Sequence, residues 1–172
     1  MDQTESQSGH KWEGKVSTRV AKASADQIWP LFVDFFNLHK WFPGLSDCYG
    51  IHGKNGEPGC VRYCAGFSIS SEGTSDPGEN RPIKWSKERL VGVDPLGRSL
   101  NYEMVDSNNG FTSYASTVRV IPGDGDGEGG CTIEWSFTVD PVEGWVLEDL
   151  VRKYEVGLQG MGRKMEDSIS VM

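Results

Sequence analysis

The sequence predicts an α+β fold in which a curved antiparallel sheet of about seven strands packs around a long C-terminal helix, with two short helices after the first strand. Three observations predict it. Apolar residues recur every three or four positions near the C-terminus. Short alternating segments separated by turn residues fill the middle of the chain, and a helix-start signal follows the first of them. Strands this numerous with so few helices cannot form βαβ units, so the sheet is expected to be antiparallel.

Residues 1–11 are polar and are expected to form a disordered tail before a single domain that covers residues 12–172. A chain of 172 residues has the size of one ordinary domain and can bury roughly 70% of its unfolded surface. The tail lacks an apolar core of signal-peptide length, and no segment is apolar for long enough to span a membrane. These features predict a cytoplasmic protein without stable membrane insertion.

The first strand is expected over residues 12–21, where apolar or small residues alternate with polar ones. Ser24 follows it, with Gln27 three residues later, which is the pattern of a helix capping box. Aromatic and aliphatic residues at helical spacing then predict the first short helix. A second helical stretch is expected over residues 37–42, ending before the Pro-Gly pair at 43–44.

Five further strands are expected, because alternating segments are separated by turn-forming residues; they cover residues 60–67, 83–93, 98–105, 112–121 and 131–139. Glycine, asparagine, proline and aspartate are concentrated in the connections, at residues 54–59, 73–82, 94–97, 107–110 and 123–130. The last connection is acidic and rich in glycine, but it lacks the spacing of a calcium loop and is interpreted as a hairpin tip.

The C-terminal segment is predicted to be an amphipathic helix of about 25 residues, long enough to cross the whole sheet. Its apolar face comprises Val146, Leu147, Leu150, Val151, Tyr154, Leu158, Met161, Met165 and Ile169. Three glycines within it, at positions 157, 160 and 162, would either kink the helix or leave room beneath it. A sheet curved around such a helix is expected to enclose a cavity for a small, largely apolar molecule.

Charge and composition exclude several classes of function. The net charge of −8 disfavours binding to phosphate backbones and anionic membranes, so no nucleic-acid partner is expected. His39 and His52 have no metal-ligand spacing with each other or with a cysteine, and the glycine clusters lack the context of a nucleotide-binding loop. No metal or cofactor is therefore expected. The four cysteines are interpreted as reduced, buried hydrophobic residues.

Arg62 and Glu88 are the candidate chemical groups, because each lies within a predicted strand. If both face the cavity, the guanidinium would hold an anionic oxygen while the carboxylate moves a proton. Alternation also permits the opposite orientation, with Tyr63 and Trp85 inward and the charged residues forming a surface ion pair.

Tyr102 and Tyr114 lie on strongly alternating strands, where they are expected either to line the pocket or to pack in the core.

Several segments resemble the lachrymatory-factor synthases of onion and its plant relatives, within the superfamily of the birch-pollen allergen, START lipid-transfer domains and polyketide cyclases. The matching segments are residues 11–16 (KWEGKV), 34–40 (DFFNLHK), 59–63 (GCVRY), 85–91 (WSKERLV) and 135–137 (WSF), with 143–144 (EG). They cover nearly the whole chain beyond the tail. The resemblance supports the same architecture, known as the helix-grip fold.

The resemblance implies a catalytic role for Arg62, as the anchor of a sulfur-bound oxygen, and for Glu88, as a proton shuttle. The implied reaction is isomerisation of a small alkenyl sulfenic acid to a thial S-oxide. The resemblance further implies that Tyr102, Tyr114 and Trp135 contact the substrate.

Two positions depart from this family: Phe111 replaces a tyrosine, and Tyr154, which would also face the substrate, replaces a tryptophan of the last helix. The pocket surface is therefore expected to differ around the charged pair.

Two interpretations of the function remain. The first is an isomerase-like enzyme that acts on a small oxygenated compound through Arg62 and Glu88. The second is a non-catalytic protein that binds or transports an apolar plant metabolite or lipid, with the charged pair holding its polar head. In both, the partner is a small apolar or amphipathic ligand, and no pattern in the sequence indicates an oligomeric state.

Overall fold

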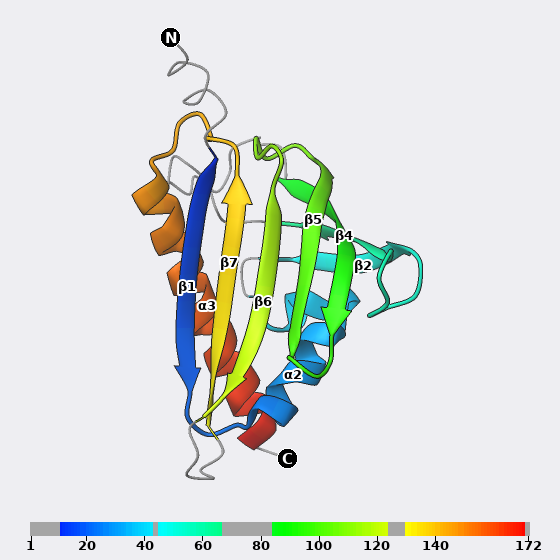
Figure 1. Cartoon of the computed structure of the whole chain (residues 1–172). Coiled ribbons are helices and arrows are strands. Elements are labelled where there is room, and N and C mark those ends of the chain that lie inside the picture. Colours follow the sequence, from blue (N-terminus) through cyan, green and yellow to red (C-terminus); the bar gives the residue numbers. More distant parts are fainter. Residues whose placement is uncertain (1–10, 43–44, 67–83, 124–129, 171–172) are drawn as a thin grey trace.

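The computed structural model describes residues 11–42, 45–66, 84–123 and 130–170. In this part of the chain, seven strands form one antiparallel sheet in the order β1-β7-β6-β5-β4-β3-β2 (Figure 1). The strands are β1 Trp12–Val20, β2 Asp47–His52, β3 Val61–Ala65, β4 Trp85–Asp94, β5 Ser99–Ser107, β6 Ala115–Pro122 and β7 Cys131–Val139. The helices are α2 Ala25–Val33, the 3₁₀-helix η1 Phe35–Lys40 and α3 Leu147–Ser170. The predicted fold class is confirmed.

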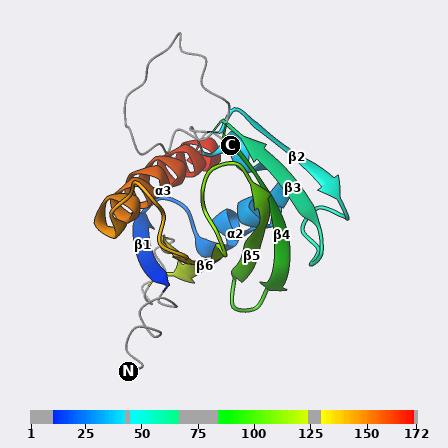
Figure 2. The ribbon, with the colours of Figure 1, turned by 90° about the horizontal axis from the view of Figure 1, so that it is seen from above.

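The sheet curves around its helices (Figure 2). The long helix α3 crosses one face beside β1, and the shorter α2 lies within the curve. Side chains from both helices meet the inward residues of β5, β6 and β7, and together they form the main core. This is the helix-grip arrangement, in which the sheet and α3 bury their apolar faces against each other.

The helix α2 begins as the sequence predicts. Ser24 is its N-cap: the Ser24 hydroxyl accepts a hydrogen bond from the backbone N–H of Gln27 at 3.1 Å. The Gln27 side chain accepts one in return from the backbone N–H of Ser24 at 3.0 Å. This reciprocal capping box satisfies two backbone donors that would otherwise lack partners. The second helical segment is a 3₁₀-helix that starts at Phe35, two residues before the predicted start.

The strand β2 was not predicted from the sequence. It lies at the edge of the sheet, and of its six residues only Cys48 is buried, so it shows no alternation of apolar and polar residues. Gly50 is required there, because the ring of Phe36 lies where a β-carbon would be, 2.2 Å from its nearest atom. The close contact between Phe36 and Gly50 joins η1 to the edge of the sheet.

Four strands, β3, β4, β5 and β6, start later than predicted, and for β5 and β6 the backbone gives the reason. The segment predicted to begin at residue 112 enters β6 only at Ala115, and the segment predicted from residue 98 enters β5 at Ser99. Ser113 and Arg98 have φ angles of 57° and 54°. These left-handed conformations belong to turns and cannot continue into an extended strand.

The helix α3 runs without interruption from Leu147 to Ser170, and its predicted apolar stripe faces the core from Leu150 onward. Val146, predicted to begin this stripe, precedes the helix and is 58% exposed, because the chain there has not yet reached the sheet surface that α3 covers.

One glycine of α3 lies at a close contact, because a β-carbon at Gly162 would lie 3.1 Å from Thr18. A β-carbon at Gly157 would make only ordinary van der Waals contact, 3.5 Å from the ring of Phe42. Gly162 therefore lets the helix approach β1 closely, where an enclosed space or a kink was considered from the sequence.

Among the described residues, no helix is both long and apolar enough to cross a membrane. The predicted tail, the Pro-Gly pair at 43–44, the connection at 73–82 and the interior of the acidic hairpin tip at 123–130 lie outside the described residues, apart from Lys11, Gly123 and Gly130.

Candidate functional site

A small, partly open cavity lies between the inner face of the sheet and the segment formed by α2 and η1. Its volume is about 20 Å³, which is room for one water-sized group. The lining side chains are Leu31, Phe32, Asp34, Phe35, Leu38, Arg62, Leu100, Tyr102, Val118, Trp135 and Met161. The expected cavity is therefore present, but the surrounding side chains nearly fill it. Apart from Asp34 and Arg62, its wall is apolar or aromatic.

Arg62 and Glu88 face inward and contact each other. They occupy directly opposite positions of β3 and β4, and their side chains are only 4% and 7% exposed. Nε and Nη2 of Arg62 both bind Oε1 of Glu88, at 2.8 and 2.7 Å. Tyr63 and Trp85 lie on the other face, where their rings stack 6.1 Å apart. Of the two orientations that the alternation permits, the structure has the inward ion pair.

The guanidinium of Arg62 is held in place from several sides. Its Nη1 donates a hydrogen bond to the backbone oxygen of Phe35 at 2.8 Å. Its Cζ lies 3.7 Å from the ring centre of Phe35 and 4.9 Å from that of Tyr102. Burial disfavours the charged form and is the largest single effect, but the Glu88 carboxylate and the neighbouring thiol and phenol groups together outweigh it, so the pKa of Arg62 is raised above its ordinary value. Arg62 is therefore a fixed cation at the wall of the cavity.

Ser86 completes the buried polar group, and sequence reasoning did not identify it. Its hydroxyl donates a hydrogen bond to Oε2 of Glu88 at 3.0 Å, and the residue is fully buried. Ser86 precedes Glu88 by two positions on β4, so both side chains face inward. That spacing is the only signal in the sequence, and it is a weak one, because serine occurs in many strands without such a role.

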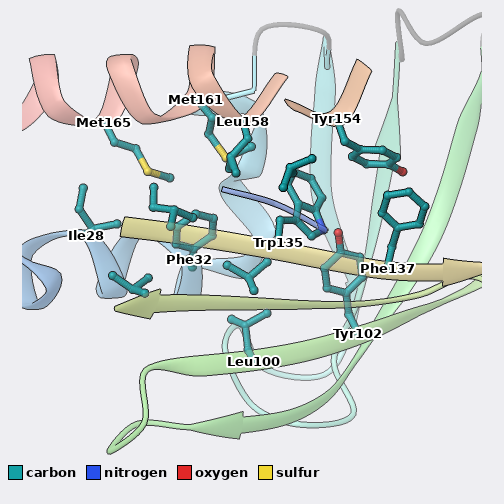
Figure 3. Close-up of a cluster of buried hydrophobic side chains, with 14 of the residues drawn as sticks. Ile28, Phe32, Leu100, Tyr102, Trp135, Phe137, Tyr154, Leu158, Met161 and Met165 are labelled. Atoms are coloured by element: carbon teal, nitrogen blue, oxygen red, sulfur yellow. The ribbon is translucent and has the colours of Figure 1, made fainter. Parts of the chain in front are cut away.

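The other four predicted site residues form an aromatic cluster with Phe137 (Figure 3 shows four of these five rings). The ring of Tyr154 lies 5.2 Å from Trp135 and 6.4 Å from Tyr114. The ring of Tyr114 lies 6.4 Å from Tyr102. Burial raises the pKa values of all three tyrosines above the ordinary phenol value. The phenols are therefore neutral groups of the core.

Trp135 is oriented by Ser116, another residue that the sequence did not reveal. The indole N–H of Trp135 donates a hydrogen bond to the Ser116 hydroxyl, which in turn donates one to the backbone oxygen of Ser136 at 3.0 Å. A buried tryptophan N–H needs such a partner, and this one fixes the plane of the ring.

The predicted site residues divide into two groups. Arg62, Tyr102 and Trp135 line the cavity, whereas Tyr114 and Tyr154 pack behind them and are not part of its wall. Glu88 reaches the cavity only through its contact with Arg62. A ligand in the cavity would thus meet the guanidinium first, with the carboxylate next to it.

Within the described part of the chain, no group of three or more histidine, cysteine, aspartate or glutamate side chains is placed to hold a metal ion. The polar groups at and beside the cavity include the Arg62 cation, the Glu88 carboxylate and the neighbouring hydroxyl groups.

Residues 12–166 match the family model described as polyketide cyclase / dehydrase and lipid transport. The matched region extends from β1 into the last turns of α3, so it includes every residue of the site described above.

Proposed function

The chain belongs to the polyketide cyclase / dehydrase and lipid transport family, and from this premise we propose that it binds a small hydrophobic molecule with one polar oxygen and isomerises it by proton transfer. Arg62 holds the oxygen, and Glu88 moves the proton. Trp135 and Tyr102 shape the apolar wall, and Tyr114 and Tyr154 support them from behind.

The buried ion pair carries this proposal. Placing an arginine and a glutamate in a protein core is costly, and such a pair often contributes little to stability compared with apolar residues of similar size. Ionisable residues buried beside a cavity therefore occur more often at functional sites than elsewhere. Arg62 of this pair and Asp34 are the charged residues of the cavity wall.

Arg62 and Glu88 retain hydrogen-bond donor and acceptor positions that a ligand could use. Arginine has five N–H donors. Among the described residues, Arg62 directs one each from Nε and Nη2 to Glu88 and one from Nη1 to Phe35. Two donors remain for a ligand oxygen. A carboxylate offers about four acceptor positions, and Glu88 uses three of them. One acceptor position remains for a proton beside the bound oxygen.

The size of the cavity favours a small substrate. A volume of about 20 Å³ holds one water-sized group, so even a ligand of a few atoms requires side chains such as Leu38 and Phe35 to move. A lipid would need a far larger rearrangement of the same core. The resemblance to the lachrymatory-factor synthases supplies a substrate class of suitable size, the small alkenyl sulfenic acids.

The proposed reaction is a balanced isomerisation. Glu88 accepts the proton of the sulfenic O–H group, and Arg62 stabilises the oxygen as it becomes negative. The carbon–carbon double bond shifts to carbon–sulfur, and Glu88 returns the proton to the alkenyl carbon farther from the sulfur. No atom is gained or lost, and no oxidant is needed.

The test is an assay with 1-propenyl sulfenic acid generated in place by an auxiliary enzyme, with thial S-oxide measured by gas chromatography. Wild type should form the product. Glu88→Gln, which keeps the shape of the side chain but cannot carry the proton, should form it about 10²–10⁴-fold more slowly. Glu103→Gln is the matched control, because Glu103 pairs with Arg89 on the exposed face of the same sheet.

Binding is measured separately with propane-1-sulfinate, which carries the anionic oxygen but cannot isomerise. Binding by both wild type and Glu88→Gln, with turnover by wild type alone, supports the proposal. Equal product formation by wild type and Glu88→Gln contradicts it. Absence of product from folded wild type, together with binding of a fluorescent fatty acid, would assign the protein to the non-catalytic carriers instead.

A further inference from the structure

A pair of cysteines lies next to the charged pair, and the proposed function does not use it. All four cysteines are buried and none forms a disulfide. Two of them, Cys48 and Cys64, face each other with their sulfur atoms 3.5 Å apart. Together with Leu45 they form a small apolar cluster, separate from the main core, against which Leu38 and Phe42 pack.

The backbone places these two cysteines within reach of a covalent bond. They occupy directly opposite positions of β2 and β3. Opposite residues of antiparallel strands have α-carbons about 4.5 or 5.5 Å apart, and both distances lie within the range that disulfides span. A disulfide requires the sulfur atoms to approach to about 2.05 Å, a movement of roughly 1.5 Å from their present separation. The edge position of β2 allows this small shift, because β2 pairs on one side only.

The environment also distinguishes the reactivity of the two thiols. Either sulfur can donate the hydrogen bond between the two thiols. With Cys48 as the acceptor, this bond and the positive charge of Arg62 lower the pKa of Cys48 to about 6 despite its burial, whereas the pKa of Cys64 is raised. Cys48 is also the more accessible thiol, 7% exposed against 1% for Cys64. Because thiolates attack electrophiles, Cys48 is assigned as the nucleophile of the pair and Cys64 as the thiol that resolves the intermediate.

We propose that Cys48 and Cys64 form a peroxide-reactive dithiol that closes to a disulfide across β2 and β3. The Cys48 thiolate attacks one oxygen of a hydroperoxide, the O–O bond breaks, and the departing oxygen takes up a proton. Cys48 is now a sulfenic acid. The Cys64 sulfur then attacks the Cys48 sulfur, the S–O bond breaks, and water leaves. The two thiols lose two electrons in total, and the hydroperoxide gains them.

Closing this bond has consequences for the cavity. Cys64 lies two positions after Arg62 on the same face of β3, and it is opposite Ser86 on β4. Leu38 packs against the cysteine cluster and also lines the cavity. The disulfide would therefore fasten the edge strand beside the residues that must move when a ligand enters. Oxidised protein is expected to bind propane-1-sulfinate more weakly than reduced protein.

Peptide mapping tests the proposal on the wild-type chain. Reduced protein is treated with hydrogen peroxide, free thiols are alkylated, and the protein is digested with trypsin without reduction. The expected product is a disulfide between the peptide of residues 41–54, which contains Cys48, and that of residues 63–84, which contains Cys64. Cys60 lies in a different peptide, residues 55–62, so a wrong pairing is visible directly.

Thermal melting of oxidised and reduced protein provides a second test. The oxidised chain should melt a few degrees higher, on the order of 5 °C, because the crosslink restricts the unfolded state. Cys48→Ser and Cys64→Ser should abolish this shift. The matched controls Cys60→Ser and Cys131→Ser, which alter equally buried cysteines, should retain it.

Any of three results would overturn the proposal. They are a disulfide that involves Cys60 or Cys131, oxidation of Cys48 that stops at sulfinic acid without a crosslink, and thiols that react with peroxide only after unfolding. Turnover of sulfenic acid plays no part in this test, so its outcome is independent of the isomerase assay.

Discussion

Two arginine–glutamate pairs span adjacent strands of the same sheet, one on each face, and the comparison shows what burial does to the same chemistry. Glu88 and Arg89 are consecutive residues of β4. Glu88 turns inward to Arg62, where both side chains are less than a tenth exposed. Arg89 turns outward to Glu103, where the two side chains are 49% and 38% exposed. The inward pair is additionally bound by Ser86 and the backbone of Phe35.

The two ion pairs differ in the loss of stability that follows when one partner is removed. An exposed ion pair in water typically contributes about 0.2–1 kcal/mol, because solvent and salt replace a missing partner. A buried charge without its partner has no such replacement, so loss of one member costs about 3–5 kcal/mol. Removal of one partner from the pair that contains Glu88 is therefore expected to lower the free energy of unfolding several-fold more than removal from the pair that contains Arg89.

The largest effect is expected for Arg62→Leu, which leaves Glu88 buried without its cation. The free energy of unfolding should fall by about 3–5 kcal/mol, measured by urea denaturation. Arg89→Leu is the matched control on the outer face and should cost less than about 1 kcal/mol. The double variant Arg62→Leu/Glu88→Leu should regain most of the lost stability, because no unpaired charge remains. Equal losses of unfolding free energy for Arg62→Leu and Arg89→Leu would contradict the expected difference between the buried and the exposed pair.

The second-largest effect concerns the pH dependence of stability. It arises from buried tyrosines, which are neutral in the folded protein and so contrast with the buried ion pair. The folded-state pKa values of Tyr102, Tyr114 and Tyr154 are raised by burial. Their contribution to stability is complete below the unfolded phenol pKa of about 10 and is lost as the pH rises from there through the folded values. Each such phenol should remove about 1.4 kcal/mol per pH unit above pH 10.

Urea denaturation between pH 9 and pH 11 measures this slope. Tyr154→Phe should reduce the slope by the share of one phenol, about 1.4 kcal/mol per pH unit. A slope that Tyr154→Phe leaves unchanged would show that Tyr154 ionises in the folded protein as freely as in the unfolded chain.

The smallest effect is expected for Glu103→Gln, which removes the carboxylate of the exposed pair. Stability should change by less than about 1 kcal/mol at low salt, and the difference from wild type should shrink further at high salt because counterions screen exposed charges. Thermal melting at two salt concentrations measures it. A larger, salt-independent loss would mean that the outer pair behaves like the inner one.

The parts of the fold that the sequence predicts well are those with a strong local signal. The capping box at Ser24 and the apolar stripe of α3 each depend on spacing within a few turns of helix, and both are confirmed. The strand β7 alternates along its whole length and was predicted with its observed bounds. The edge strand β2 has only one buried residue, so no local pattern marks it.

The candidate site could not be predicted from local sequence pattern alone. Alternation placed Arg62 and Glu88 on one face of their strands, but it could not decide whether that face was the inner one, because Tyr63 and Trp85 are equally suitable for a core. The family resemblance favoured the orientation that the structure has. Ser86 and Ser116 were missed because a single serine in a strand gives no signal of its partner. The small volume of the cavity depends on how side chains such as Phe35 and Leu38 pack, which no spacing reveals.

The pairing of β1 with β7 also bears on how the chain folds during synthesis. Trp12 of the first strand lies opposite Val139 of the last. At the usual speed of translation, about 5–20 residues per second, these partners leave the ribosome roughly 6–25 s apart. Until then β1 has no neighbour in the sheet, and its apolar face is available to other chains. Arrested nascent chains that end before β7 should therefore require chaperones, whereas chains that extend through α3 should not.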